Sequence, residues 1–465
     1  MRQHVLLRRG HVMTLDRSIG DIEGGDVLLA DDRIAAIGRD LPCPEGTEVI
    51  DASGTIVMPG LVNAHIHTWQ LGLRGIGSDW VSSRDYYTNI HSGMAKLYGP
   101  EDNRVANLLG ALVEKNGGTR TIFDWCHNLR DPEMTDASID GLEESGIRAV
   151  FGHGTAKPPP EPGEKPHWEV PHPREEIRRL RTGRLSADER LVTLAMAILG
   201  PDDCTYEVTR ENIRMAREFG IISSAHTWGR EGKRFVPDGM WRLQKEGLLG
   251  PDHNVSHGNN FEDDELHMIL DAGCTISATP MTEMFNNDRV ALLGRVTARG
   301  AMPSLGTDVD PYFNSSMLSV TRHAFQHQRE IDNRELAARG AWPSKTQHAT
   351  TTRKALEWAT IGGAKALRLD HRIGTLAPGK QADVILVRHD GLTAFPALPG
   401  GDPAHVVVTH AEQADVDSVF IAGRPVKRDG KLLFPAARLA ELKDRLRASR
   451  ERIMREGNYR YRPAG

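Results

Sequence analysis

Strand-like and helix-like segments alternate along this chain from about residue 57 to residue 306. Short apolar stretches predict eight strands, at residues 57–64, 120–125, 147–152, 191–198, 221–225, 254–256, 274–278 and 302–306. Helix-like segments fill the gaps, at residues 100–116, 136–145, 174–182, 207–219 and 261–272, with a later one near residues 352–360. Eight strands that alternate with helices predict an α/β fold, a (β/α)8 TIM barrel.

Short strands are also predicted on both sides of this region, at residues 5–7, 26–29, 33–37, 383–387 and 416–421. The whole chain has 465 residues, which is long for one compact domain. We therefore expect residues 1–56 plus 370–435 to form a small composite β-sandwich domain beside a barrel of residues 57–369. The charged, periodic segment 439–455 predicts a surface helix within a C-terminal helix and tail of residues 436–465.

Composition excludes several classes of protein. The net charge of −5 is not gathered into runs, so no nucleic-acid partner is expected. No segment approaches the apolar length that spans a bilayer, and no membrane association is expected. The four cysteines form neither a CxxC pair nor a disulfide framework, which favours a cytoplasmic protein with reduced thiols.

Seven prolines fall within residues 157–173. Proline removes a backbone donor and fixes φ, so this segment cannot be a helix or a central strand. It follows the third predicted barrel strand, on the face where such barrels place their sites. An exposed loop and a semi-rigid lid are both open interpretations.

Histidines at predicted strand ends are the main functional signal. His65 and His67 are separated by one residue, so on a strand both imidazoles point to the same side. His226, His257 and Asp308 each come at the end of a later predicted strand. The carboxyl ends of all barrel strands meet at one face, so these five side chains are expected to converge. Imidazole and carboxylate groups together suit a divalent metal.

The chain resembles the amidohydrolase superfamily, in its branch of cytosine deaminases and triazine hydrolases (chlorohydrolases). The resemblance rests on MPGLVNAHIHT, on LRG at 73–75, on His226 and His257, on GTD ending at Asp308 and on IGTLAPGKQADVILV near the end of the chain. It implies a metal-dependent hydrolase that acts on carbon–nitrogen bonds other than peptide bonds. It also implies a homo-oligomer.

The resemblance implies that His65, His67, His226 and Asp308 bind one divalent metal ion per chain, with zinc favoured over iron, cobalt or manganese. Binuclear branches use a carboxylated lysine on the fourth strand, and LVTLAMAILG offers none. A bound metal would supply hydroxide at neutral pH. Asp308 can accept the proton of the water, and neutral His257 can donate a hydrogen bond where negative charge builds.

One position departs from the deaminase pattern. A glutamate normally follows the fifth-strand histidine by three residues and carries a proton, but Gly229 stands there. We expect Asp308 to act as base and Glu283, just after the seventh strand, to be the best candidate acid. A solvated loop carboxylate is the other interpretation of Glu283, and it is favoured for the second candidate, Glu231.

The predicted function is hydrolysis of a C–N or C–halogen bond of a small, cyclic or heteroaromatic compound. Because Gly229 replaces the glutamate, hydrolysis of an amide, urea or carbamate is the alternative. A third possibility, a non-catalytic binding protein, conflicts with the presence of every expected ligand. Trp69, Trp80, Trp125 and Trp228 follow predicted strands and are expected either to wall an apolar pocket or to pack under loops.

Overall fold

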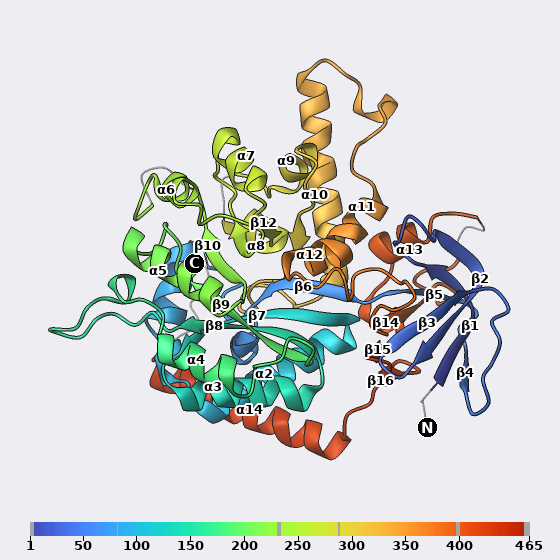
Figure 1. Ribbon diagram of the computed structural model, residues 1–465, viewed down its shortest axis with the longest axis horizontal. Helices are drawn as coiled ribbons and strands as arrows, with labels where there is room; N and C mark the ends of the chain where they lie inside the picture. Colours follow the sequence, from blue (N-terminus) through green and yellow to red (C-terminus); the bar gives the residue numbers. More distant parts are fainter. Residues whose placement is uncertain (1–3, 81, 230–233, 287–288, 397–399, 460–465) are drawn as a thin grey trace.

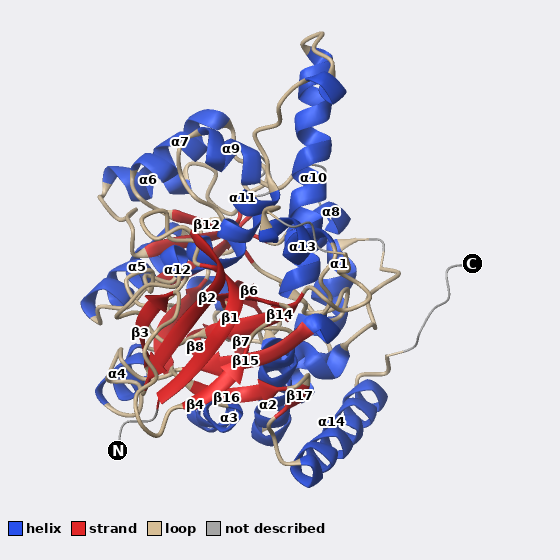
Figure 2. Ribbon diagram, turned by 90° about the vertical axis from the view of Figure 1, so that its right-hand side faces the viewer, coloured by secondary structure: helices blue, strands red, loops and turns tan. Residues whose placement is uncertain are grey.

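A computed structural model describes residues 4–80, 82–229, 234–286, 289–396 and 400–459. Its strands form two sheets, a nearly closed eight-stranded barrel and a separate nine-stranded sheet (Figures 1 and 2). The predicted fold, an (β/α)8 barrel beside a small β-structure built from both termini, is confirmed. Among the described residues, no helix combines the length and apolar character that crossing a bilayer requires.

The barrel strands are adjacent in chain order, and each pairs in parallel with the next. They are β6 (Leu61–Ile66), β7 (Thr119–Leu129), β8 (Arg148–Thr155), β9 (Val192–Ile198), β10 (Ser223–Thr227), β11 (His253–His257), β12 (Thr275–Ala278) and β13 (Ser304–Leu305). A parallel bridge from Ile66 to Asp308 joins the first strand to the segment after the last. This bridge brings the first strand of the barrel next to the segment that follows the last strand.

Helices surround these strands. They include α2 (Pro100–Asn116), α3 (Pro132–Ser145), α4 (Arg174–Thr182), α5 (Tyr206–Glu218), α6 (Gly239–Lys245), α7 (Asp263–Asp271), α9 (Leu293–Ala298) and α11 (Thr352–Glu357). The start and end of α3 have clear local causes. The Asp131 side chain accepts a hydrogen bond from the Met134 backbone N–H, and Gly146 ends the helix with φ 67°.

The second sheet combines both ends of the chain. Its order is β17-β16-β15-β14-β5-β1-β2-β3, with β4 paired to β1. The bounds are β1 (His4–Met13), β2 (Asp21–Ala30), β3 (Arg33–Gly38), β4 (Glu48–Asp51), β5 (Thr55–Pro59), β14 (Val384–Arg388), β15 (Val416–Ile421), β16 (Arg424–Arg428) and β17 (Lys431–Leu432). Apolar side chains from the early and late strands, such as Leu7, Val27, Val57 and Phe420, share one buried core.

The apolar run 57–64 is two strands rather than one. Residues 57–59 belong to β5 and pair with β14, whereas Leu61 begins β6 of the barrel. The switch occurs at Gly60, where any side chain would collide with Arg120, since an added Cβ would lie 1.5 Å from Arg120 Cγ. Within this stretch, Pro59-Gly60 is the sequence signal of the point where the chain enters the barrel.

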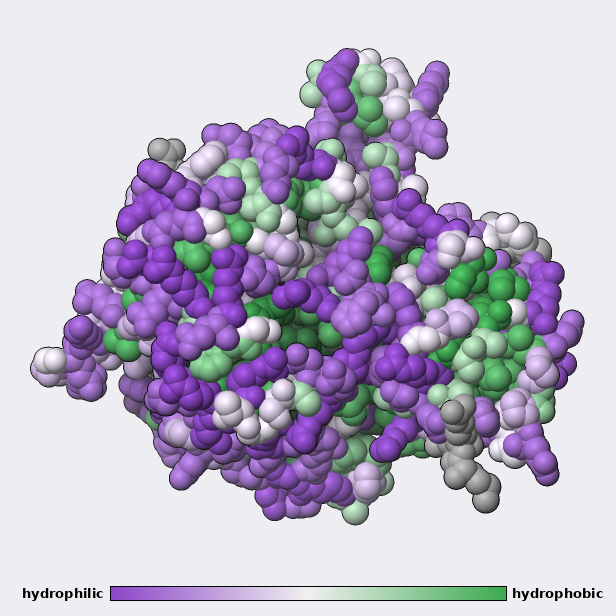
Figure 3. Space-filling model, in the orientation of Figure 1, coloured by the Kyte–Doolittle hydropathy of each residue, from purple (hydrophilic) through white to green (hydrophobic). Residues whose placement is uncertain are grey.

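The helix α10 (Met317–Ala338) has no counterpart among the helices expected from the sequence. It projects from the body of the molecule (Figure 1). Its buried residues lie from Met317 to Gln328. The remainder of the helix therefore lacks a buried apolar face. Its far end is mostly hydrophilic (Figure 3), although Trp342 beyond it is 69% exposed.

The C-terminal helix α14 (Ala436–Glu456) lies close to the predicted segment and packs beside α2. Leu442 and Ile453 are its buried residues, Leu439 and Leu446 are partly buried, and most of its exposed residues are charged. Between the two sheets, Arg148 of β8 forms a buried ion pair with Asp383, the residue before β14, at 2.7 Å between Nε and Oδ2.

Candidate active site

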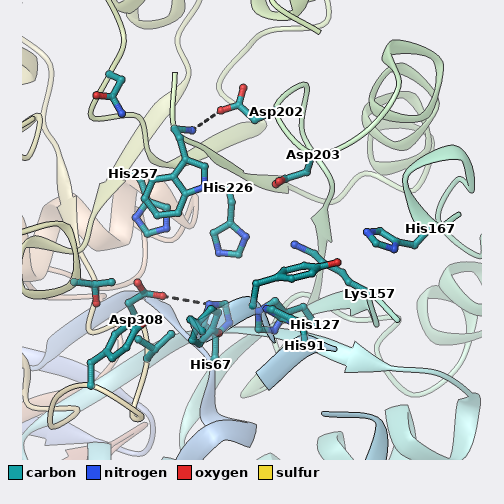
Figure 4. A pocket seen from close by; sticks show the side chains of 17 residues that line it. His67, His91, His127, Lys157, His167, Asp202, Asp203, His226, His257 and Asp308 are labelled. Carbon is teal, nitrogen blue, oxygen red and sulfur yellow. Dashed lines mark hydrogen bonds and ion pairs between the residues drawn. The ribbon is translucent and has the colours of Figure 1, made fainter. Parts of the chain in front are cut away.

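Five side chains singled out in the sequence converge at the carboxyl ends of the barrel strands. Figure 4 shows four of them, His67, His226, His257 and Asp308. His65 lies near the end of β6 and His67 follows it, while His226 and His257 lie in β10 and β11. Asp308 follows β13. All five are at least nine-tenths buried. His257 and Asp308 have φ of 73° and 62°, a left-handed backbone that non-glycine residues seldom adopt and that is common at functional sites.

The spacing of these side chains suits a set of metal ligands. Nε2 of His65 lies 3.2 Å from Nε2 of His226 and 3.4 Å from Oδ1 of Asp308. The same Oδ1 lies 3.3 Å from Nε2 of His67. Ligand bonds of about 2.0–2.1 Å, as for zinc, place neighbouring ligand atoms roughly 3 Å apart, and the ring nitrogens of His65, His67 and His226 form one close group. The residues present therefore fit one divalent ion.

Hydrogen bonds behind the imidazoles favour the neutral form, whose Nε2 lone pair can bind a metal. Nδ1 of His67 donates to the backbone carbonyl of Trp125 at 2.6 Å, which leaves Nε2 with a free lone pair. Nδ1 of His65 lies 3.0 Å from the Ser256 hydroxyl. Burial lowers the pKa of His65 to about 4 and that of His226 well below its ordinary value. Both imidazoles are thus neutral at physiological pH.

Asp308 is held as a carboxylate. Burial raises its pKa, but its contacts with the neighbouring imidazoles of His65 and His67 lower it more, so that the pKa lies well below its usual value. An ionised carboxylate among neutral imidazoles is the donor set that binds zinc and similar ions. On the fourth strand, β9, the described residues include no lysine.

His257 and Glu283 form a buried pair beside these four residues. Nδ1 of His257 donates to Oε1 of Glu283 at 3.3 Å, and the Thr279 backbone N–H holds the same oxygen at 2.9 Å. Burial lowers the pKa of His257, yet the hydrogen bond to Glu283 and the charge of Asp308 raise it more, so the net shift is upward. With Nδ1–H committed to Glu283, His257 offers Nε2 to the cavity, as an acceptor when neutral and as a donor when protonated.

Glu283, at the start of α8 (Pro280–Asn286), is not among the described residues that line the cavity. The structure places it one layer behind His257, in contact with the imidazole rather than with open space. The solvated-loop interpretation is wrong, because Glu283 is only 1% exposed. Any part that it has in proton transfer therefore passes through His257.

Gly229 leaves no room for a side chain. Its φ is 70°, and an added Cβ would lie 2.7 Å from the ring and the backbone nitrogen of Phe261. Among the described residues, Asp202 is the carboxylate that contacts this position, and it accepts hydrogen bonds from the backbone N–H groups of Trp228 at 2.6 Å and Gly229 at 3.0 Å. Burial raises the pKa of Asp202 to about 6. Glu231, the other candidate, lies outside the described residues.

The cavity in front of the candidate metal site has a volume of about 340 Å³, suited to a small ligand. Trp228 is the one tryptophan in its described lining, and its ring stacks on His257 at 4.3 Å between centroids. The other three tryptophans pack elsewhere. Trp69 and Trp125 are buried beneath the site, and Trp80 packs against Tyr312. Most of the aromatic wall consists of Tyr86, Tyr87, Tyr312 and histidines.

Several lining residues were not predicted, namely His91, His127, Lys157, His167, Asp202 and Asp203. His127 had a usable signal, because β7 continues past residue 125 and places it at a strand end. His91 and His167 lie in short helical turns and the others in loops, where no periodic pattern indicates direction. Arg74 of the LRG motif pairs with Asp310 at 2.8 Å, and so ties the segment after β6 to the one after β13.

Comparison with known proteins agrees with this architecture. Residues 56–426 match the model of the amidohydrolase family. The chain is 29% identical over 420 residues to a 5'-deoxyadenosine deaminase of Methanothermobacter thermautotrophicus, which covers 89% of this chain and 91% of that protein. It is 26% identical over 416 residues to a 5-methylthioadenosine/S-adenosylhomocysteine deaminase of Pyrococcus furiosus, covering 88% and 92%.

Solved structures share the fold. An adenosine deaminase from Xanthomonas campestris with bound zinc superposes with a TM-score of 0.79 at 21% identity, covering 97% of this chain and 98% of that one. An atrazine chlorohydrolase from Arthrobacter aurescens complexed with zinc gives a TM-score of 0.81 at 21% identity, covering 96% and 100%. At this level of identity the likeness concerns the fold.

Proposed function

This chain belongs to the amidohydrolase family, and from that premise we propose that it hydrolyses an exocyclic carbon–nitrogen bond of a small heteroaromatic compound with one divalent metal. The observation that carries the proposal is the group of three imidazoles at metal-ligand spacing, with the Asp308 carboxylate within 3.4 Å of two of them, at one end of a small cavity walled by rings. The curated relatives described above are deaminases, which favours an amine as the leaving group.

His65, His67, His226 and Asp308 would hold the ion, and zinc is the metal that both structural neighbours contain. Iron, cobalt and manganese are accepted by the same nitrogen and oxygen donors. When bound, such an ion lowers the pKa of a water molecule toward neutrality and supplies hydroxide at ordinary pH.

The chain's own residues move the protons. Asp308 has spare lone pairs and would accept the proton of the attacking water. His257 faces the cavity through Nε2 and, when protonated, would donate to the ring nitrogen or leaving group where negative charge develops. Glu283 fixes the orientation of His257 from behind. Trp228, stacked on His257, would present its ring as one wall for a flat substrate.

The alternative reaction, hydrolysis of an amide, urea or carbamate, gains no support from these relatives. Replacement of the usual glutamate by Gly229 was its motivation, and the His257–Glu283 pair offers another route for the proton. Hydrolysis of a carbon–halogen bond needs the same residues and is the second candidate, because an atrazine chlorohydrolase shares the fold.

The test is a comparison of leaving groups on zinc-loaded protein. We expect ammonia release from heteroaromatic amines, loss of that activity on chelation, and its return when zinc is added. A chlorinated analogue of each active amine measures the second candidate on the same ring. The proposal would be contradicted if the protein turned over aryl ureas but no heteroaromatic amine and no heteroaromatic chloride in the panel.

A further inference from the structure

The side of the cavity opposite Asp308 carries a positive charge without a partner. Lys157 follows β8 and lines the cavity, and Figure 4 shows its amino group pointing into the open space. No carboxylate among the described residues lies within ion-pairing distance of it. Asp202 lines the same cavity but is engaged by the Trp228 and Gly229 backbone N–H groups and by Arg234.

A fixed neutral donor lies on the same side. The indole N–H of Trp69 donates to Nδ1 of His127 at 3.0 Å, and an indole nitrogen can only donate. Nδ1 therefore keeps its lone pair, and the hydrogen of His127 must be on Nε2. No described residue accepts from Nε2, and the imidazole lines the cavity.

The ring of His127 cannot turn away easily. It stacks on His67 at 4.0 Å between centroids with planes 15° apart, and it packs edge-on against His91 at 4.6 Å. Its donor is thus held in place before any ligand arrives. Preorganised donors bind better than mobile ones because they lose little conformational freedom on binding.

We propose that Lys157 and His127 form a subsite for a carboxylate group of the substrate. A lysine ammonium and an imidazole N–H would each engage one carboxylate oxygen, and the charge-assisted bond to the ammonium would be the stronger. No arginine is among the described lining residues, so the bidentate fork that favours phosphate is missing. Of the described lining carboxylates, Asp308 belongs to the candidate metal site and Asp202 is engaged by Arg234 and two backbone N–H groups, so Asp203 is the one that would oppose such a ligand.

The position of this subsite agrees with the proposed function. Its role in substrate binding rests on that function. In Figure 4, Lys157 lies on one side of the cavity and Asp308 and His257 on the other, with His67 and His226 between them. A carboxylate held by Lys157 would therefore place the rest of a small ring over the candidate metal ligands. The substrate class becomes a heteroaromatic amine that bears a carboxylate.

Binding of nicotinate and nicotinamide tests this without any need for turnover, so its failure is distinct from failure of the proposed reaction. The two probes share a ring and differ in the charge of one substituent. On zinc-loaded protein at neutral pH, ligand-observed NMR titration should give roughly tenfold tighter binding of nicotinate. Lys157→Met should remove that preference, and Lys157→Arg should keep most of it. Lys165 is an exposed residue of the same loop, so the control Lys165→Met should leave the preference unchanged.

His127 is tested through its partner. Trp69→Phe keeps an aromatic ring but removes the N–H that fixes the hydrogen on Nε2, and nicotinate affinity should fall several-fold. Unchanged nicotinate affinity in this variant would remove His127 from the subsite. A nicotinate preference that survives Lys157→Met, tighter binding of inorganic phosphate than of nicotinate, or the absence of any preference in the wild type would overturn the proposal.

Discussion

At the scale of single residues, the position that distinguishes this chain is Gly229. A deaminase-like glutamate is missing there, and the geometry explains why no side chain can replace it, since an added Cβ would meet Phe261 at 2.7 Å. The proton that the leaving group needs must come from another group. His257, fixed from behind by Glu283, presents a ring nitrogen to the cavity beside the candidate metal ligands.

Glu283→Gln tests this route. A glutamine keeps the size of the side chain but removes the charge that favours protonated His257, so turnover should fall by about 10²–10⁴. The loss should be smaller for substrates with better leaving groups, because these need less proton donation. Zinc content should stay intact. A uniform small loss across a leaving-group series would exclude Glu283 and leave Asp308 as the carrier of the proton.

Gly229→Ala should destabilise the fold rather than alter the chemistry. The left-handed φ alone costs about 1–2 kcal/mol for an alanine, and the contact with Phe261 adds to that cost. Gly220→Ala is the matched control, since Gly220 has φ 65° and open space around it. Urea denaturation should show a clearly larger loss for Gly229→Ala, and equal losses would mean that Phe261 yields without cost. Gly229→Glu is expected to suffer the same clash, which argues against a simple return to the deaminase pattern.

At the scale of elements, strand ends were the productive signal. His65, His67, His226, His257 and Asp308 could all be placed because parallel barrel strands deliver their last residues to one face. Lys157, Asp202 and Asp203 could not, since they lie in loops whose direction depends on tertiary contacts. The projecting helix α10 escaped notice for a related reason, because most of it packs on nothing that would require an apolar stripe.

The proline-rich segment 157–173 projects from the molecule as an exposed loop, and two residues at its base reach the cavity. Residues 158–165 are exposed, whereas Lys157 and His167 at the base of the projecting part line the cavity. Replacing residues 159–165 with a short glycine linker should leave the melting temperature within a few degrees, since no buried contact is lost. Substrate affinity should fall, because Lys157 and His167 lose the loop that holds them in place.

Replacing all of residues 157–167 in the same way provides the comparison. It should leave the melting temperature similar and weaken substrate binding further, because Lys157 and His167 are then gone. A collapse of solubility in the shorter replacement would mark the tip as a contact between subunits or with the fold itself.

At the scale of the whole molecule, the alternation of strands and helices predicted the barrel, and the short strands at both ends predicted the second sheet. The boundary between them was less visible, because residues 57–59 pair with β14 before the chain turns at Gly60 into the barrel. The link between the sheets was not visible at all. Arg148 and Asp383 are 235 residues apart in the chain, and only the fold brings them into a buried ion pair.

The central claim is that His65, His67, His226 and Asp308 hold one metal ion, and metal content tests it most directly. Elemental analysis of protein purified without chelators should give one equivalent of a divalent metal per chain. His65→Ala and Asp308→Ala should lose that metal and all activity. The control His127→Phe should retain the metal, because it alters a ring stacked on His67 but no proposed ligand. Two equivalents in the wild type, or a full equivalent with near-normal turnover in either alanine variant, would contradict the account.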